Sequence, residues 1–267
     1  MASLAPVRDG LPAGYTGKVC VGTSGWIYKD WAKSFYPPGF PVKNRFSFYA
    51  GRFPTVEINA SFYRLPTEAA FVHWREQAPP GFVYSVKASR AVTHYKRLLP
   101  GAKSFDLLME RSRQLNGRLG PILWQLPGSM RKDLNRLQNF LQTLPRDLPH
   151  AMEFRDPSWL DADTFALLRE AGVAQVSVSS LRMPACHELT AGFAYVRFHG
   201  LEGGAAHDYT EEELQPWAEF LRDCARRGLT GFAYFNNDVN TRAPQNALLL
   251  MKMLGEWSMP PACSRTD

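Results

Sequence analysis

The sequence predicts an α/β fold with a single (β/α)8 TIM barrel, and three observations lead to this prediction. Eight short runs rich in β-branched and aromatic residues recur along the 267 residues, and most precede a segment with helical periodicity. Eight such units within about 250 residues match the usual size of this barrel. No glycine-rich phosphate-binding motif follows any of the runs, so an open, doubly wound sheet is the weaker alternative.

The elements follow from this alternation, taken in chain order. The expected strands are Val19–Thr23, Thr55–Asn59, Phe82–Ala88, Pro121–Gln125, Ala151–Arg155, Ala174–Ser179, Ala194–His199 and Gly231–Asn236. The expected helices are Lys43–Ala50, Thr67–Gln77, Ser104–Asn116, Arg131–Thr143, Asp161–Glu170, Glu211–Arg227 and Pro244–Leu254. Thr67 and Thr210 each precede glutamate, which favours a helix start. The sixth crossover, around Arg182–Thr190, is expected to be poorly helical.

The predicted barrel accounts for nearly the whole chain as one domain. Residues 1–18 form a polar segment without the apolar stretch of a signal peptide, so we expect a flexible lead-in, then the barrel over 19–257 and a tail at 258–267. No apolar run approaches the ~20 residues that span a bilayer. The four cysteines are scattered without metal-ligand spacing, which predicts reduced thiols in a cytoplasmic protein with no membrane association. The sequence does not indicate an oligomeric state.

Polar residues alternate with apolar ones in most predicted strands, which places them inside the barrel. Helices cover the outside of a TIM barrel, so the apolar positions of each strand should point outward. The polar residues expected to point inward, near the carboxyl ends of the strands, are Glu57, Asn59, Lys87, Gln125, Glu153, Arg155, Ser179, Arg197, His199 and Asn236. Barrel enzymes place their active sites at this end.

The charges of this inner set indicate an anionic ligand. With His199 neutral, two glutamates face three basic side chains, which leaves one positive charge. Residues 1–133 also carry 19 basic and 8 acidic side chains, against 12 and 17 in residues 134–267. An alternative is a closed plug of ion pairs that binds no ligand.

The same strand ends carry the motifs of a known family. The chain resembles the YecE-like family, a bacterial and archaeal domain of unknown function numbered seventy-two, over about residues 19–254. The matching motifs are Gly22-Thr23-Ser24-Gly25-Trp26, Val56-Glu57-Ile58-Asn59, Val86-Lys87-Ala88-Ser89-Arg90, Glu153-Phe154-Arg155, Arg197-Phe198-His199-Gly200 and Tyr234-Phe235-Asn236-Asn237. The resemblance implies a TIM barrel but no particular reaction. The family often ends its sixth strand with aspartate, whereas this chain has Ser179, so a role for that carboxylate does not transfer.

The charge balance favours chemistry on a phosphate-bearing substrate by a hydrolase or lyase. Lys87, Arg155 and Arg197 would clamp the phosphate oxygens, Glu57 or Glu153 would act as general base, and His199 would protonate the leaving oxygen. Further substrate contacts are expected from Asn59, Gln125, Asn236 and His94. Trp26, Tyr63, Arg64 and Arg90 on the adjacent loops would extend the site, and the aromatic and basic side chains among them suit nucleic acid.

Three other interpretations remain open at this stage. The same mouth could bind an anionic metabolite or nucleic acid without catalysis, because this fold hosts many unrelated functions. A glycosidase-like hydrolase would use Glu57 and Glu153 as its two carboxylates. No cofactor is expected, although a single weakly held Mg²⁺ or Mn²⁺ on Glu57, Glu153 and Asn236 is a further alternative. The deciding feature is whether either glutamate is free of its cationic neighbours.

Overall fold

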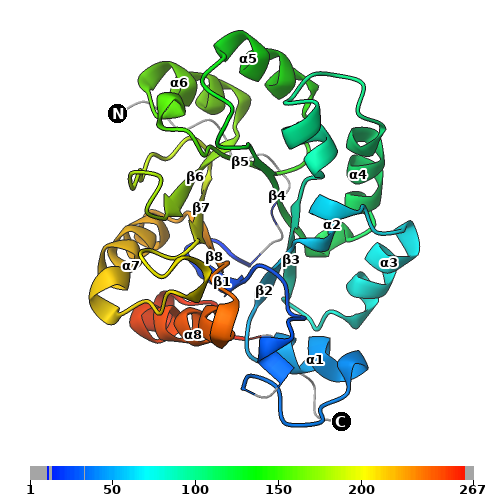
Figure 1. The fold of residues 1–267 in the computed structure, drawn as a ribbon, viewed down its shortest axis with the longest axis vertical. Helices are drawn as coiled ribbons and strands as arrows, with labels where there is room; N and C mark the ends of the chain where they lie inside the picture. The colour runs from blue at the N-terminus through cyan, green and yellow to red at the C-terminus, as the bar shows by residue number, and fades with distance from the viewer. Residues whose placement is uncertain (1–10, 12–13, 33, 262–267) are drawn as a thin grey trace.

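Eight parallel strands form a nearly closed barrel surrounded by helices, as the sequence predicts (Figure 1). The computed structural model describes residues 11, 14–32 and 34–261. The strands are β1 (Val19–Thr23), β2 (Thr55–Ile58), β3 (Val83–Lys87), β4 (Leu119–Gln125), β5 (His150–Glu153), β6 (Ala174–Ser179), β7 (Phe193–Phe198) and β8 (Thr230–Phe235). Every predicted strand is present, and its ends differ from the prediction by at most two residues.

The helices lie between successive strands and cover the outside of the barrel (Figure 1). They are α1 (Arg45–Ala50), α2 (Ala60–Tyr63), α3 (Glu68–Gln77), α4 (Lys103–Arg113), α5 (Leu134–Thr143), α6 (Ala162–Ala171), α7 (Glu211–Arg226) and α8 (Arg242–Leu254). The short α2 was not predicted, because four residues are too few to show a helical period. No helix connects β6 to β7 through residues 180–192, all of which are described, which confirms the poorly helical sixth crossover.

The barrel closes where β1 meets β2. The sheet order runs β1-β8-β7-β6-β5-β4-β3-β2, and a parallel bridge between Ser24 and Glu57 joins its two ends. Gly22 permits the close approach, because a Cβ atom there would lie 2.2 Å from the Thr55 carbonyl oxygen. The Tyr49 hydroxyl spans the same seam: it accepts a hydrogen bond from the Thr23 amide (2.9 Å) and donates one to the Thr55 carbonyl (3.0 Å).

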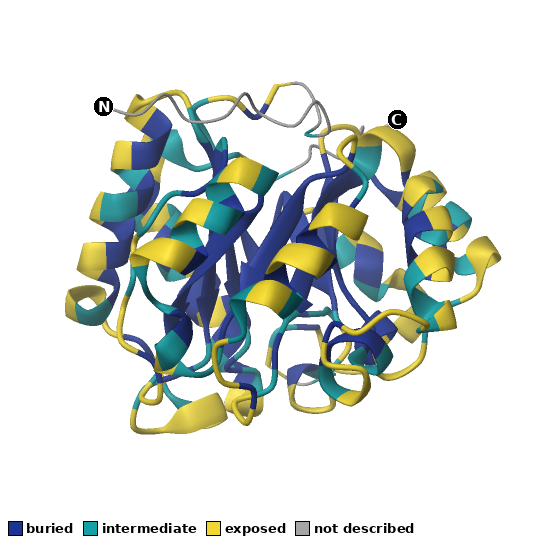
Figure 2. Cartoon of the chain, turned by 90° about the horizontal axis from the view of Figure 1, so that it is seen from above, coloured by how far each residue is buried: buried dark blue, intermediate teal, exposed yellow. Residues whose placement is uncertain are grey.

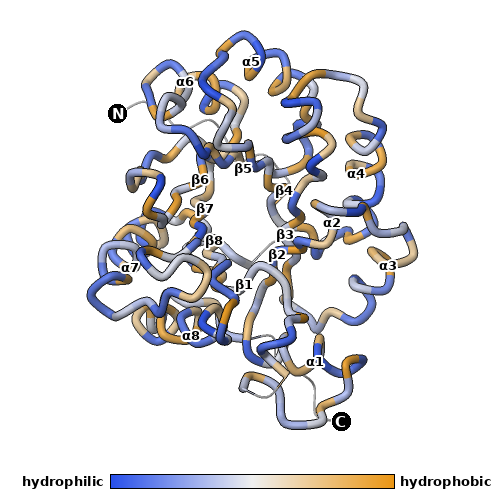
Figure 3. The backbone as a smooth tube through the Cα atoms, viewed as in Figure 1, coloured by the Kyte–Doolittle hydropathy of each residue, from blue (hydrophilic) through white to orange (hydrophobic). Residues whose placement is uncertain are grey.

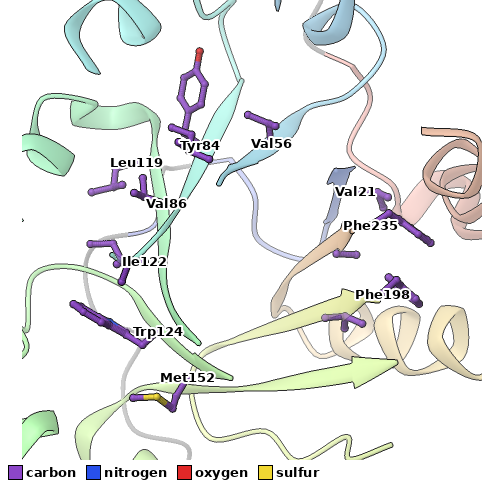
Figure 4. Packing of buried hydrophobic residues seen from close by; sticks show 14 of the residues in the cluster. Val21, Val56, Tyr84, Val86, Leu119, Ile122, Trp124, Met152, Phe198 and Phe235 are labelled. Carbon is purple, nitrogen blue, oxygen red and sulfur yellow. The ribbon is translucent and has the colours of Figure 1, made fainter. Parts of the chain in front are cut away.

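Apolar side chains fill the layer between strands and helices. The outward residues Val56, Val86 and Phe198 belong to one large buried cluster with helix residues such as Leu137 and Leu214. Figure 4 shows part of this cluster, and Figure 2 shows that the strands are buried while the helices turn one side to solvent. Hydrophobic and hydrophilic residues therefore alternate along the helices in Figure 3. This packing fixes which strand residues point into the barrel.

The amino-terminal end of the barrel is filled by apolar side chains. Tyr15 is buried beside Cys20 and Phe232 on the inner face, and its hydroxyl donates to the Gly81 carbonyl. The expected flexible lead-in over 1–18 therefore does not hold at Tyr15, because a large apolar ring is more stable inside the barrel than in water. Residues 1–10 and 12–13 of that lead-in and 262–267 of the expected tail lie outside the described residues.

One inward assignment is wrong. Ser179 pairs in register with Phe198, which points outward, and its hydroxyl is 2.8 Å from the Tyr209 hydroxyl. Val178 pairs with Arg197 and is the residue that points inward. The sequence of β6 alternates between small apolar and small polar side chains, so its period alone does not show which set faces the helices. The register with β7 shows that Val178, and not Ser179, faces the barrel interior.

Candidate functional site

Arg197 lies at the centre of a polar layer inside the barrel, near the carboxyl ends of the strands. Its guanidinium contacts Glu153 Oε2 at 2.6 Å and Glu57 Oε1 at 2.7 Å, and all three side chains are fully buried. Strands β2, β5 and β7 therefore each supply one member of this triad. A buried charge is tolerated when it is paired and hydrogen-bonded, and Arg197 provides both for the two carboxylates.

Glu57 has no unused carboxylate oxygen. Besides Arg197, its Oε1 accepts a hydrogen bond from Ser24 Oγ at 2.7 Å, and its Oε2 accepts one from the Tyr195 hydroxyl at 2.7 Å. Burial and the adjacent Glu57 charge raise the pKa of Tyr195 well above its usual value, so this hydroxyl remains a donor. Three donors, from Ser24, Tyr195 and Arg197, therefore hold the Glu57 carboxylate inside the barrel.

Glu153 is equally committed. Its Oε1 accepts from Gln125 Nε2 at 2.7 Å and lies 3.0 Å from both Arg155 Nη1 and His199 Nε2. Burial alone would raise the pKa of Glu153, but the Arg197 guanidinium outweighs it and holds this pKa well below the usual range. Every carboxylate oxygen of the two glutamates therefore already accepts at least one hydrogen bond, and neither side chain is exposed.

His199 is neutral and anchored on both ring nitrogens. Burial, together with the nearby guanidinium of Arg197, lowers its pKa to about 4. Asn236 Nδ2 lies 3.2 Å from its Nδ1, and Asn59 Nδ2 lies 3.4 Å from the Asn236 side-chain oxygen. If Asn236 donates to Nδ1, the ring proton is on Nε2, which then donates to Glu153.

A pocket of about 300 Å³ lies above this layer, at the carboxyl end of the barrel. Its lining includes Lys87, Arg155, His199 and Asn236 from four different strand ends, together with His94, Gln125 and residues 126–128. Six of the predicted substrate and catalytic residues thus meet around one cavity. Glu57, Glu153 and Arg197 lie beneath it and set its charge.

Lys87 is the unusual member of the pocket. Its side chain is buried, and within the described parts of the chain Nζ makes no ion pair or hydrogen bond to protein. Nζ instead lies 4.3 Å from the centre of the Phe62 ring. Burial, and then the charge of Arg197, lower the pKa of Lys87 to about 8, so the amine is still mostly protonated at neutral pH.

The pocket therefore carries an excess positive charge. Glu57 and Glu153 balance two of the three basic side chains, and His199 is neutral. One positive charge therefore remains, and both Lys87 and Arg155 line the pocket. The Arg155 side chain is 24% exposed. These two side chains are the lysine and the arginine that line the pocket.

The remaining predicted residues lie outside this pocket, as far as the described residues define it. Trp26 packs edge-on against Phe46 of α1 and Trp74 of α3, with ring centres 5.5 and 6.0 Å away, and it does not line the pocket, so its substrate contact stays a prediction. Tyr63 is the last residue of α2, Arg64 follows it and Arg90 follows β3, and none of them lines the pocket. Asn59 does not line it either, but its Nδ2 lies 3.4 Å from the Asn236 side-chain oxygen.

Three contributors to the site were missed from the sequence. Ser24 and Tyr195 both bind Glu57, and residues 126–128 form a wall of the pocket. Tyr195 shares the inward phase of Arg197 and His199, so the alternation of the seventh strand could have identified it. The loop at 126–128 carries no polar side chain that would have marked it.

The geometry does not fit the alternative of a divalent cation on Glu57, Glu153 and Asn236. Arg197 already bridges the two carboxylates. Among the described residues, no group of three or more His, Cys, Asp or Glu side chains is placed to hold a metal ion.

The sequence of the whole chain was compared with those of known proteins. The model of the family described as proteins of unknown function DUF72 matches residues 20–265. The chain is 24% identical to the UPF0759 protein YunF of Bacillus subtilis, over 88% of this chain and 94% of that protein. It is 30% identical to the UPF0759 protein YecE of Escherichia coli K12, over 42% of this chain and 41% of that protein.

Solved structures agree with the fold. A DUF72 family protein from Thermotoga maritima is 29% identical and has a TM-score of 0.81, covering 89% of this chain and 99% of that one. A second DUF72 structure, from Enterococcus faecalis, has a TM-score of 0.78 at 18% identity, over 93% and 100% of the two chains. No helix in the described residues is both long enough and apolar enough to cross a bilayer. The resemblance seen in the sequence is confirmed, and the chain belongs to the DUF72 family of proteins of unknown function.

Proposed function

We propose that the pocket binds a small phosphate-bearing ligand, held by Lys87 and Arg155. The observation that carries this proposal is the buried Lys87 amine, which faces a polar pocket and has no protein acceptor among the described residues. An unpaired buried cation is unfavourable, and an anion with several acceptor oxygens would satisfy it. Gln125 and Asn236 also line the pocket and supply neutral hydrogen-bonding groups.

The proposal assigns Glu57 and Glu153 to charge balance and not to proton transfer. Both carboxylates are fully buried, and each of their oxygens accepts at least one hydrogen bond. A general base or a glycosidase nucleophile needs access to the reacting atom, which neither side chain has. The geometry therefore favours a binding site over a hydrolase that depends on these residues. We place the protein in the cytoplasm, because the three described cysteines are free thiols.

Calorimetric titration with inorganic phosphate tests the proposal. The Lys87→Met variant removes the amine but keeps most of the side-chain volume, so phosphate affinity should fall by about tenfold or more. Lys96→Met is the matched control, because Lys96 is exposed on the neighbouring loop and does not line the pocket. Equal phosphate affinity of the wild type and Lys87→Met, or no phosphate binding by the wild type, would contradict the proposal.

A second candidate function extends the ligand to single-stranded nucleic acid. Tyr63 and Tyr95 are 68% and 69% exposed, and they are the only aromatic side chains among the large exposed hydrophobic residues of the described chain. The Arg90 guanidinium lies 5.5 Å from the centre of each ring. Phe62 connects this group to the pocket, since its ring contacts both Tyr63 and His94. Bases could stack on the tyrosines while a phosphate occupies the pocket.

The salt dependence of oligonucleotide binding separates this candidate from a small ligand. Binding of a single-stranded DNA should weaken steeply as salt rises, and Arg90→Gln should reduce both the affinity and the slope. Arg113→Gln, which changes an exposed side chain paired with Asp147, should alter neither. A flat salt response would exclude recognition of the nucleic-acid backbone and leave the small-ligand proposal in place.

A further inference from the structure

We infer that Lys87 is a nucleophilic amine that condenses with the carbonyl group of a phosphorylated aldehyde or ketone in the same pocket. This inference rests on the proposed phosphate site, which would hold the ligand beside the amine. It adds a covalent step and a substrate class to the binding function. The argument depends on three features of Lys87: its burial, the absence of a partner, and its place in the pocket.

Burial distinguishes Lys87 from the other lysines of the described chain. It is the only one of them that is buried. Lys132, by contrast, pairs with Asp161, and Lys18 donates to the Glu256 carbonyl at 2.8 Å. Lysines of a structural kind satisfy their charge in this way or leave it in water. Lys87 does neither.

Burial and the nearby guanidinium of Arg197 make the protonated form of Lys87 less favourable than it is in water. The two nearby carboxylates are occupied by Arg197, and the centre of the Phe62 ring lies 4.3 Å from Nζ. A hydrophobic wall and neighbouring cations are the two conditions that activate lysine nucleophiles. With a pKa of about 8, the neutral fraction at pH 7 is a few hundred-fold larger than that of an ordinary lysine, whose pKa is near 10.4.

The pocket can hold a phosphate and a carbonyl group at the same time. Arg155 can bind the phosphate, while Lys87 reaches the cavity from β3 and His94 from the following π-helical turn, Ala91–Tyr95. Burial, and then the charge of Lys87, lower the pKa of His94, so its ring is a neutral hydrogen-bonding group in the pocket. A volume of about 300 Å³ suits a compound of this size.

The proposed step balances without an oxidant or reductant. The protonated amine first releases one proton to solvent, and the neutral nitrogen attacks the carbonyl carbon. The carbonyl oxygen takes up one proton from solvent and one from the attacking nitrogen and leaves as water, while a carbon–nitrogen double bond forms. The sum is one ammonium group and one carbonyl group giving one iminium group and one water, with no change in oxidation state.

Borohydride trapping with pyridoxal 5′-phosphate, a phosphorylated aldehyde, tests the inference. The full chain is incubated with one equivalent of the probe, reduced with sodium borohydride, and analysed by intact mass and peptide mapping. We expect one adduct per chain, located on Lys87. The Lys87→Arg variant should lose it, whereas Lys96→Arg should keep it, because Lys96 is exposed outside the pocket. Mapping of the wild-type adduct gives an answer even if a variant does not fold.

Pyridoxal without its phosphate separates the two levels of the proposal. If phosphate guides the probe, labelling of Lys87 should be on the order of tenfold faster with the phosphorylated compound. Equal rates would keep Lys87 as a reactive amine but contradict the phosphate site. Adducts spread over exposed lysines with Lys87 unlabelled, in a protein that binds inorganic phosphate by calorimetry, would overturn the inference and leave the proposed function standing.

Discussion

Arg197 is the residue that makes the polar interior of this barrel stable. Its guanidinium forms an ion pair with both Glu57 and Glu153, so it compensates the negative charges of these two buried side chains. The same pairing keeps both carboxylates buried beneath the pocket. The residues available to a ligand are then Lys87 and Arg155, so the interior network decides the chemistry of the pocket above it.

Removal of Arg197 should therefore be costly. Arg197→Met leaves two buried carboxylates without their partner, and we expect the free energy of unfolding in urea to fall by about 3–5 kcal/mol. Arg113→Met breaks an exposed pair with Asp147 and should change it by less than about 1 kcal/mol. A similar small loss for Arg197→Met would show that the triad does not stabilise the barrel.

Neutral His199 predicts a loss of stability in mild acid. Its pKa is about 4 in the folded chain and about 6.5 in the unfolded chain, so the unfolded state binds more protons between these values. The stability that His199 contributes is complete above pH 6.5 and is lost as the pH falls toward 4. Between pH 7 and pH 5 the loss should be about 2 kcal/mol.

Urea unfolding at both pH values measures this effect. His199→Gln should show a smaller difference between pH 7 and pH 5 than the wild type. His73→Gln changes an exposed histidine and should keep the wild-type difference. An unchanged pH difference in His199→Gln would mean that this histidine is protonated as easily in the folded chain as in the unfolded one.

At the scale of elements, hydrophobic alternation predicted every strand and the inward direction of the charged residues. It worked where one face of a strand is apolar and the other charged, as where Met152 and Phe154 alternate with Glu153 and Arg155. It failed for Ser179, because the apolar set of β6, which includes Val178, faces the barrel interior. It also could not show that Trp26 packs against α1 and α3, since a loop side chain has no period.

The packing of Trp26 against α1 and α3 leads to a prediction about stability. Trp26→Ala removes the ring that packs against Phe46 and Trp74, so stability should fall by about 2–4 kcal/mol. The affinity for inorganic phosphate, measured by calorimetry on the folded variant, should not change. Weaker phosphate binding with unchanged stability would show that Trp26 contributes to the binding site.

At the scale of the whole molecule, the two ends of the barrel have different tasks. The amino-terminal end is closed by Tyr15 and by the segment in which the Met259 amide donates to the Val19 carbonyl at 2.8 Å. The carboxyl end holds the polar layer and the pocket. The sequence predicted this division only in part, because the contacts of Tyr15 and Met259 join segments that are distant in the chain.

Tyr15 should stabilise the barrel without affecting the site. Tyr15→Ala leaves a cavity at the closed end, and we expect a loss of about 3–5 kcal/mol in the free energy of unfolding. Tyr15→Phe keeps the ring and loses only the hydrogen bond to Gly81, so its loss should be about 1 kcal/mol. Phosphate affinity should be unchanged in both variants. A loss of phosphate binding in Tyr15→Phe would show that the closed end of the barrel influences the pocket, which contradicts this prediction.

The central claim is that an anion binds between Lys87 and Arg155, above the closed triad. A crystal of the wild-type protein soaked with selenate, a phosphate analogue that can be located by its anomalous scattering, tests it most directly. We predict one selenate within hydrogen-bond distance of Lys87 Nζ and of the Arg155 guanidinium, with Glu57 and Glu153 still bound to Arg197. An empty pocket at saturating selenate, or a carboxylate released from Arg197 to face the cavity, would contradict the account.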